Sequence, residues 1–287
     1  MRDASEVELR DVRGPSALAG GWKRFWELTF LIASTDFKRT YFGTALGYLW
    51  SVARPLMLFA VLVEVFTHVF RLGSQIPHYP VFLLFNLVLF GFFQESTVTA
   101  VSSIVAQEGV VRKTQFPRLA IPAAVVLTAF FNLALNLIAV FAFILGFGVS
   151  PMWTWLLLPV ILAMFWAITL PVAMLLASLY PRFRDLSILW SVFVTALFYA
   201  SPILYSLENV KSKSNTIAQL IALNPLTPML DLAHRWIIGP ASSAPYPGTA
   251  AAGGVGKLIA SVAILVVLIV LGIWAFNREA PRIAEEL

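Results

Sequence analysis

The residues that could carry out acid–base or metal chemistry are few and scattered. The sequence has no cysteine, which excludes disulfides, thiolate metal sites and a cysteine nucleophile. Its three histidines, His68, His78 and His234, have no spacing that would bring them to one metal ion. The long apolar runs contain Glu64, His68 and Glu95 without a paired-carboxylate or His-Glu-x-x-His pattern. We therefore expect neither a catalytic centre nor a metal site in this chain.

A glycine-rich stretch, residues 253–258, has only part of a phosphate-binding loop. Such a loop needs a glycine separated by four residues from its Gly-Lys pair, and a serine or threonine after the lysine. Ala251 and Leu258 occupy these positions, and no strand pattern precedes them. We expect no nucleotide site in the chain, so the energy for any ATP-driven process must come from another subunit.

A polar segment, residues 107–122, separates two long apolar runs. It carries one acidic residue, three basic residues and two prolines. A segment of this kind is unstable in hydrocarbon, where each unpaired polar group costs several kcal/mol. We expect it to face another protein and to transmit a push to the two apolar runs that it joins.

The elements that must position this segment are membrane-spanning helices. The 287 residues are 59% hydrophobic and 12% charged, whereas about 25% of residues are charged in a soluble domain. We expect each of six apolar runs to form a helix that is long enough to cross a hydrocarbon core of about 30 Å. These predicted spans cover about residues 52–70, 81–105, 121–147, 153–179, 186–204 and 258–276. The sequence therefore predicts an all-α polytopic membrane protein with six transmembrane helices.

The basic residues predict the orientation of these spans. With the N-terminus in the cytoplasm, fifteen lysines and arginines fall on the inner side and five on the outer side. Basic residues concentrate in cytoplasmic loops, so we expect both termini and the 107–122 segment to be cytoplasmic in a bacterial plasma membrane. This bias explains the net charge of +5 better than nucleic-acid binding does.

An amphipathic helix is predicted over residues 22–39, ahead of the first span. Trp22, Phe25, Trp26 and Phe30 form its aromatic side, and basic residues occupy the other side. Such a helix fits the headgroup plane of a membrane; a helix packed on another element is the alternative. The expected divisions are a cytoplasmic tail with this helix at 1–45, a transmembrane domain at 46–279 and a C-terminal tail at 280–287.

The outer segment between the fifth and sixth spans contains two short apolar pieces within residues 215–238. Each is too short to span a bilayer, so we expect re-entrant or interfacial helices hinged at Asn224 and Pro225. Asp231 and Arg235 are four residues apart and can pair on one helix face. These helices form either an outer gate or a plain surface element with a weak ion pair.

Four short motifs stand at the ends of the predicted spans. They are residues 46–50 (Leu-Gly-Tyr-Leu-Trp) with Arg54-Pro55-Leu56, the stretch 110–118 ending in Phe116-Pro117-Arg118, residues 181–185 with 201–205, and residues 224–228 continuing to Arg235. In this order and at these places, over about residues 35–278, they resemble the membrane subunits of ABC-2 type exporters in the polysaccharide branch. Glu108 and Gly109 depart from the pattern of that family.

This resemblance implies a homodimer of six-span subunits bound to two ATP-binding subunits, which would hold ATP and Mg²⁺; no cofactor is expected in this chain. It implies a substrate in which a glycan of the O-antigen, galactan or teichoic acid type is attached to a polyprenyl pyrophosphate lipid. It places the amphipathic helix at the inner membrane surface. The residues expected to dock in a groove of the ATP-binding subunit are Gln107, Glu108, Arg112, Lys113, Phe116, Pro117 and Arg118.

Two further groups of residues are assigned by this resemblance. Arg182 and Arg184, with Asp185, are expected where the pyrophosphate headgroup enters from the cytoplasm, because guanidinium groups bind phosphates. Inner-side anchors paired with Asp185 are the alternative. Some aromatic residues are expected to line the path of the glycan. The outer gate is assigned to Ser201, Pro202, Tyr205, Asn224, Pro225, Asp231 and Arg235.

Two other functions stay open at this point. The same fold could export a hydrophobic drug or lipid, although the aromatic content of 14% and the Gly/Pro-rich outer segment favour a glycan. A membrane-embedded glycan transferase is the second alternative, and the lack of an acidic cluster argues against it.

Overall fold

The computed structural model describes residues 21–70, 76, 78–109, 116–239 and 254–279, and within these ranges the chain is helical without a strand. The long apolar runs form helices because the backbone groups then bond within each segment, as hydrocarbon requires. The helices are α1 (Gly21–Tyr41), α2 (Leu49–Glu64) with the π-helix η1 (Val65–Val69), α3 (Tyr79–Ala106), α5 (Ala120–Gly146), the 3-10 helix η3 (Trp153–Leu157), α6 (Leu158–Leu179), α7 (Leu186–Tyr199), α8 (Leu207–Lys213), α9 (Asn215–Ala222), α10 (Leu226–Ile237) and α12 (Val255–Glu279).

Five of the described helices are long and apolar enough to cross a membrane. Their limits lie close to those of five predicted spans, because charges, glycines and prolines end the apolar runs. The chain is therefore a multi-pass membrane protein. The five helices are Leu49–Val69, Tyr79–Ala106, Ala120–Gly146, Trp153–Leu179 and Val255–Glu279.

The fifth predicted span, residues 186–204, is shorter than expected. α7 has 14 residues, which extend about 21 Å at 1.5 Å per residue. It ends at Tyr199 because Pro202 lacks an amide proton and disfavours the helical conformation at Ser201. The chain then turns, and the Ile203 amide donates to the Ser201 carbonyl at 2.8 Å. The prediction that all six runs are long enough is therefore wrong for α7.

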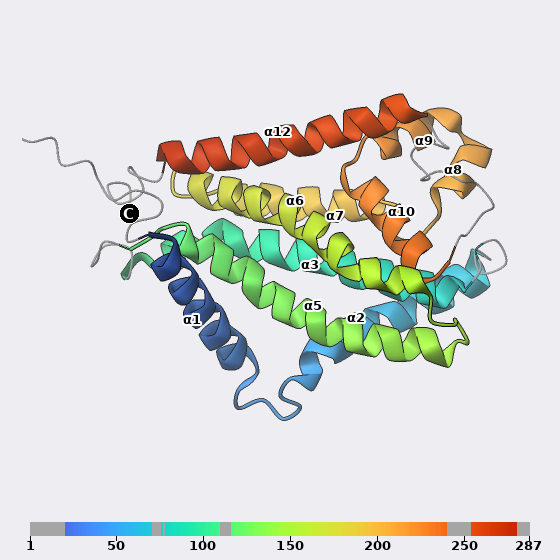
Figure 1. Cartoon of the computed structure of the whole chain (residues 1–287), viewed down its shortest axis with the longest axis horizontal. Helices are drawn as coiled ribbons and strands as arrows, with labels where there is room; N and C mark the ends of the chain where they lie inside the picture. The colour runs from blue at the N-terminus through green and yellow to red at the C-terminus, as the bar shows by residue number, and fades with distance from the viewer. Residues whose placement is uncertain (1–20, 71–75, 77, 110–115, 240–253, 280–287) are drawn as a thin grey trace, which may run out of the picture.

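α3 is the central helix of the bundle. Most of its side chains are buried, among them Phe85 and Phe90. They are covered because α2, α5, α6, α7 and α10 all pack against α3. α12 packs on α6, while α1 packs on α5 and leans away from the other long helices (Figure 1).

α12 approaches α6 closely at Gly272. A Cβ atom at this position would lie 2.7 Å from the carbonyl carbon of Pro171, which is inside α6. Real Cβ atoms do not come this close to a backbone, so only glycine fits here without a shift of the helices. Small residues allow such close approach between helices in membranes.

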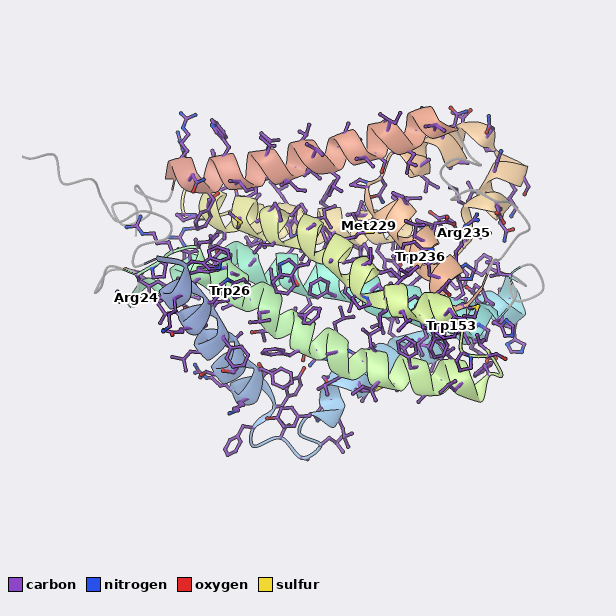
Figure 2. All side chains as sticks on the ribbon, viewed as in Figure 1. Arg24, Trp26, Trp153, Met229, Arg235 and Trp236 are labelled. Atoms are coloured by element: carbon purple, nitrogen blue, oxygen red, sulfur yellow. The ribbon has the colours of Figure 1, made fainter. Side chains whose placement is uncertain are left out.

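Different helices lie at the two ends of the bundle (Figure 1). The first turns of α1 and the last turns of α12 lie at one, which we call the α1 end. The short helices α8, α9 and α10 lie at the other, which we call the α10 end. Trp26 lies toward the first and Trp153 and Trp236 toward the second (Figure 2), as expected for aromatic residues at two membrane surfaces.

The 3-10 helix η3, which leads into α6, holds the last turn of α10. The indole Nε1 of Trp155 donates to the Ile237 carbonyl at 2.7 Å, and the Thr154 hydroxyl donates to the Trp236 carbonyl. The final carbonyl groups of a helix have no partner within the helix. These two bonds therefore satisfy the last turn of α10 and fix it to η3.

Candidate functional site

Phe116 is buried at the α1 end, in a group of apolar side chains that we call the Phe116 cluster. Its side chain is 6% exposed and packs with Phe25 of α1, Ile104 of α3 and Phe276 of α12. The predicted docking segment is therefore anchored in the bundle by this ring. Pro117 is buried as well, and Gln107 and Glu108 are half-exposed at the end of α3; Arg112 and Lys113 lie outside the described residues.

Arg118 is a buried cation in the same segment. Its side chain is 2% exposed, and its Nη1 atom has no hydrogen-bond partner in the described part of the chain. Loss of water around the guanidinium lowers the pKa of Arg118. It stays positive at neutral pH, because free arginine has a pKa above about 12.

α1 is amphipathic, as predicted, but its aromatic side is divided between two environments. Phe25 and Ala33 are buried where α1 packs on α5, whereas Trp22, Trp26 and Phe30 are exposed. The predicted alternative of a helix packed on another element is thus correct for one side. The exposed rings form a separate side that remains available to a membrane surface.

A polar groove opens between α1, α2, α3 and α5. It consists of two cavities of about 540 and 520 Å³, and Glu95, Thr99, Ala129 and Asn132 line both of them. We call it the Glu95 groove. The other charged and aromatic residues that line it are Asp36, Arg39, Tyr41, Trp50, Arg54, Phe90, Phe92 and Phe198.

Asn132 is the centre of the hydrogen bonds in this groove. Its Oδ1 accepts from the Tyr41 hydroxyl at 2.9 Å, and its Nδ2 donates to the Glu95 carboxylate. Asn136 donates to the Asn132 carbonyl at 3.0 Å. Burial raises the pKa of Tyr41, so its hydroxyl keeps the proton that it donates. One amide side chain therefore joins α1, α3 and α5.

The Glu95 groove has the chemistry to hold a molecule with both polar and apolar faces. Amide, carboxylate and guanidinium groups can bond to hydroxyl or phosphate oxygens, and flat rings can cover apolar surface. The sequence did not predict this groove, because its residues come from five helices, Phe198 of α7 included, and form no local motif. One signal was present: an ionisable residue in an apolar run, such as Glu95, marks a functional position by default.

The structure brings predicted gate residues together at the α10 end. Asn224 Nδ2 donates to the Ser201 hydroxyl at 2.8 Å, and Asn224 Oδ1 accepts from the Leu226 amide at 3.0 Å. Ser261 of α12 donates to the Asn224 carbonyl at 3.4 Å. We call this set the Asn224 junction. The carbonyl of Pro202 accepts from Asn86 of α3 at 3.4 Å.

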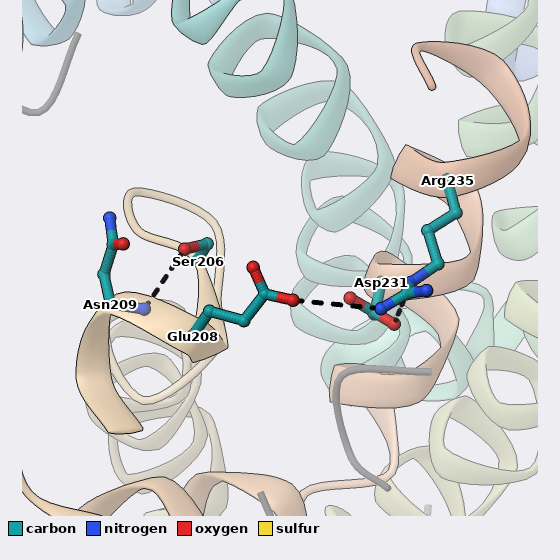
Figure 3. A network of polar contacts seen from close by, with 5 residues as sticks. All are labelled: Ser206, Glu208, Asn209, Asp231 and Arg235. Carbon is teal, nitrogen blue, oxygen red and sulfur yellow. Dashed lines mark hydrogen bonds and ion pairs between the residues drawn. The ribbon is translucent and has the colours of Figure 1, made fainter. Parts of the chain in front are cut away.

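Arg235 connects α10 to α8 (Figure 3). Its Nε donates to Asp231 Oδ2 at 3.1 Å, as the four-residue spacing predicted, and its Nη2 lies 3.9 Å from Glu208 Oε1. Glu208 was missed because α8 was not predicted. Its signal was Ser206, which accepts from the Asn209 amide at 3.3 Å as a helix N-cap.

Two titratable groups near Arg235 are kept neutral by burial. His234 packs edge-on against Phe82, with ring centroids 4.8 Å apart. Burial is the main cause that lowers the pKa of His234 to about 4, with the charge of Arg235 second. Burial raises the pKa of Tyr205 to about 12, and its hydroxyl donates to the Tyr199 carbonyl at 2.8 Å. His234 and Tyr205 therefore add no charge beside the Glu208–Arg235–Asp231 set.

Arg182, Arg184 and Asp185 lie in the exposed turn between α6 and α7. The Arg182 guanidinium is 5.7 Å from the Phe183 ring centroid, and that of Arg184 is 5.4 Å from the Tyr180 ring centroid. Among the described residues neither arginine forms an ion pair with Asp185. Both guanidinium groups are therefore accessible to an anion.

These observations define the class: a multi-pass, all-helical membrane protein with a polar groove inside its bundle and, in the described ranges, no group of residues that could hold a metal ion. The signature of the ABC-2 type transporter family matches residues 27–235, and the chain belongs to this family. It is similar to the O-antigen export system permease protein RfbA of Klebsiella pneumoniae, with 34% identity over 207 residues, which are 71% of this chain and 78% of that protein. It is also similar to RfbA of Myxococcus xanthus, with 30% identity over 203 residues, which are 71% of this chain and 77% of that protein.

Proposed function

We propose that the chain is the membrane-spanning permease subunit of an ATP-driven exporter that moves a polyprenyl-linked polysaccharide out of the cytoplasm. The observation that carries this proposal is the 34% identity to an O-antigen export permease over 71% of the chain. The glycan is of the O-antigen, galactan or teichoic acid type. ATP and Mg²⁺ bind to a separate ATP-binding subunit, and this chain has a transport role rather than an enzymatic one.

In this proposal residues 46–279 form a transmembrane domain with six crossings in a bacterial plasma membrane. The fifth crossing along the chain consists of α7 and the turn that follows it. Both termini and the α1 end are cytoplasmic, and α8, α9 and α10 lie at the outer face. The excess of basic residues assigned to the inner side supports this orientation.

The subunit acts as a homodimer. α7 leaves a row of large apolar side chains exposed, including Ile188, Leu189, Val192 and Phe193. A helix of 14 residues also ends inside the hydrocarbon layer, where its last carbonyl groups need cover from protein. A second copy of the subunit would provide this cover.

The segment from Gln107 to Arg118 docks in a groove of the ATP-binding subunit. Because Phe116 packs with α1, α3 and α12, a displacement of this segment moves several helices at once. Phe116 thus transmits motion from inside the bundle, and the contact with the partner is made by the polar residues of the segment. α1 lies at the inner membrane surface and is carried along, since Phe25 belongs to the same cluster.

The glycan passes along a path that starts at Arg182 and Arg184, which attract the pyrophosphate headgroup with Asp185 beside them. The Glu95 groove contacts its sugar units, because its amide and carboxylate groups can bond to hydroxyls beside aromatic rings. The Asn224 junction and the Arg235 set form the outer gate. There Asn224 and Pro225 provide the hinge between α9 and α10.

Co-purification from native membranes tests the first part of this proposal. The tagged subunit is extracted in a mild detergent, and the proteins that come with it are identified and quantified. We expect an ATP-binding subunit in near-equal amount, and its loss when the segment is altered by Gln107→Ala and Glu108→Lys together. Recovery of the intact subunit without any ATP-binding protein would overturn the proposal.

Depletion of the subunit tests its cargo. We expect a lipid-linked glycan to accumulate on the cytoplasmic side, with a matching loss of that glycan from the cell surface. A Glu95→Gln variant that is inserted normally should show the same accumulation. An exporter of drugs or simple lipids would leave both glycan pools unchanged on depletion.

A further inference from the structure

Arg118 combines burial with the lack of a counter-charge. Its side chain is 2% exposed, its Nη1 atom has no hydrogen-bond partner, and it forms no ion pair with any residue in the described ranges. A buried charge is costly unless it is paired and hydrogen-bonded. Buried arginines are accordingly almost always paired, and within the described part of the chain this side chain has no such partner.

The first turn of α5, which follows Arg118, adds positive potential and carries no acidic residue. Arg118 directly precedes α5, whose first turn has no acidic residue and whose N-cap has no side-chain hydrogen bond. The amino end of a helix carries a partial positive charge that favours anions. The acidic residue of the same segment, Glu108, already takes part in another interaction. The first amides of α5 already donate to the carbonyls of Pro117, Arg118 and Leu119, and Pro122 has no amide proton. An anion at this point would therefore bond to the guanidinium and gain from the helix only through its dipole.

We propose that Arg118 is the receptor for a carboxylate side chain of the ATP-binding subunit. This inference rests on the proposed function and names the chemistry of the docking contact. A carboxylate can accept two parallel N–H groups of a guanidinium. The segment 107–118 carries one acidic and three basic residues, so it fits an acidic groove. A guanidinium that is already out of water loses little further hydration when this carboxylate arrives.

The position of Arg118 favours a protein partner over a lipid headgroup. Arg118 lies within the docking segment itself, next to Phe116 and beneath the surface of the bundle. Anionic lipid headgroups at the same end meet Lys23 and Arg24 first, because both are exposed on α1. A side chain of a protein that engages the segment is the group that would reach Arg118.

The test uses Arg118→Met, which keeps an unbranched side chain and removes its charge. Removing one partner of a buried charge pair at an interface costs roughly a 30-fold or greater loss of affinity, and we expect such a loss for the ATP-binding subunit. In the absence of the ATP-binding subunit, the same substitution should stabilise the subunit. Its Tm in detergent should rise by a few degrees, because an uncompensated buried charge is replaced by an apolar group.

Two further variants make the result specific. Arg278→Met removes an exposed cation at the same end, and it should change neither the affinity nor the Tm. Arg118→Lys keeps the charge and introduces an amine. Carbodiimide activates a carboxylate of the partner, the amine attacks the activated carbon and loses a proton, and an amide forms as the urea departs. Mass spectrometry should find position 118 joined to an aspartate or glutamate of the ATP-binding subunit.

The possible outcomes separate this inference from the proposed function. An unaltered subunit that binds no ATP-binding protein would overturn both. Normal binding by the unaltered subunit and equal binding by Arg118→Met would overturn the inference alone. A lower Tm of the free Arg118→Met subunit would also overturn it, because Arg118 would then be paired within the chain. So would a loss of binding to anionic vesicles with no change toward the ATP-binding subunit.

Discussion

At the scale of single residues, polar side chains in this protein link apolar helices through hydrogen bonds. Asn132 bonds to Tyr41 and Glu95 on two other helices, and Asn224 bonds to Ser201 and to Ser261. In hydrocarbon a polar side chain without a partner is costly, so such bonds fix which helices meet and at what depth.

Replacing Asn132 should therefore loosen α1 from the bundle. Asn132→Leu leaves the Tyr41 hydroxyl and the Glu95 carboxylate without this partner, and each unsatisfied buried group costs roughly 1–3 kcal/mol. We expect a lower Tm in detergent and faster proteolysis at the ends of α1. Asn136→Leu is the matched control, because it removes one bond to a backbone carbonyl. Equal losses for the two variants would contradict a joining role for Asn132.

At the scale of elements, the packing of α12 on α6 depends on Gly272, which has no side chain. Gly272→Val should separate these helices, because its Cβ would meet the Pro171 carbonyl. Overpacking of this kind costs roughly 1–3 kcal/mol, measured as a loss of free energy of unfolding in detergent. Gly256→Ala in the first turn of α12 meets open space and should be neutral or slightly stabilising. Equal stability of Gly272→Val and the unaltered chain would rule out this close contact.

The ion pair between α8 and α10 should contribute a measurable coupling energy. Arg235 and Glu208 lie on different helices and are only partly exposed, so a double-mutant cycle with Glu208→Gln and Arg235→Gln should give about 0.5–1 kcal/mol. Amide hydrogen exchange in α8 should speed up in each single variant, because the same contact is lost. An identical α8 exchange rate in all variants would show that other contacts hold this helix.

Helix limits could be predicted from the sequence where a local pattern determines them, whereas features that depend on packing between helices could not. The long apolar runs predicted five helices nearly to the residue, since charges and prolines mark their limits. Which side of α1 faces α5 was not predictable. The pattern grouped Phe25 with Trp22 and Trp26, whereas only Phe25 is buried and the two tryptophans are exposed. The early end of α7 was encoded by Pro202, a local signal that the run length concealed.

At the scale of the whole molecule, α7 should lie at the contact between two copies. The chain has no cysteine, so single cysteines introduced by Ile188→Cys and Val192→Cys are unique labels. A bifunctional thiol reagent applied to membranes should join two copies through these positions. Val266→Cys on the exposed side of α12 is the control and should stay monomeric. Cross-linking at α12 and not at α7 would place the contact elsewhere.

The candidate sites, like the helices, were predictable only where their residues are close together in the sequence. The Asp231–Arg235 pair follows from residues close together in the sequence, and its prediction is confirmed. The docking role of residues 107–118 was predicted from an equally local pattern and stays a prediction. The Glu95 groove and the link from Glu208 to Arg235 join different helices, and no single stretch of sequence contains them. Arg118 is an intermediate case: its identity was clear from the segment, but its burial depends on how the Phe116 cluster packs around it.

The capping of α10 by Thr154 and Trp155 has a mechanical consequence. One end of α10 is fixed to η3 by hydrogen bonds to its backbone carbonyls, and dissolved ions screen these bonds little. The link from α10 to α8 is an ion pair, which dissolved ions screen. The attachment of α10 to η3 is therefore largely independent of salt, whereas the contact between α10 and α8 depends on it in part; α8 also packs on α9 through Leu207. Raising the salt concentration should then loosen the contact between α8 and α10 while the attachment of α10 to η3 stays unchanged.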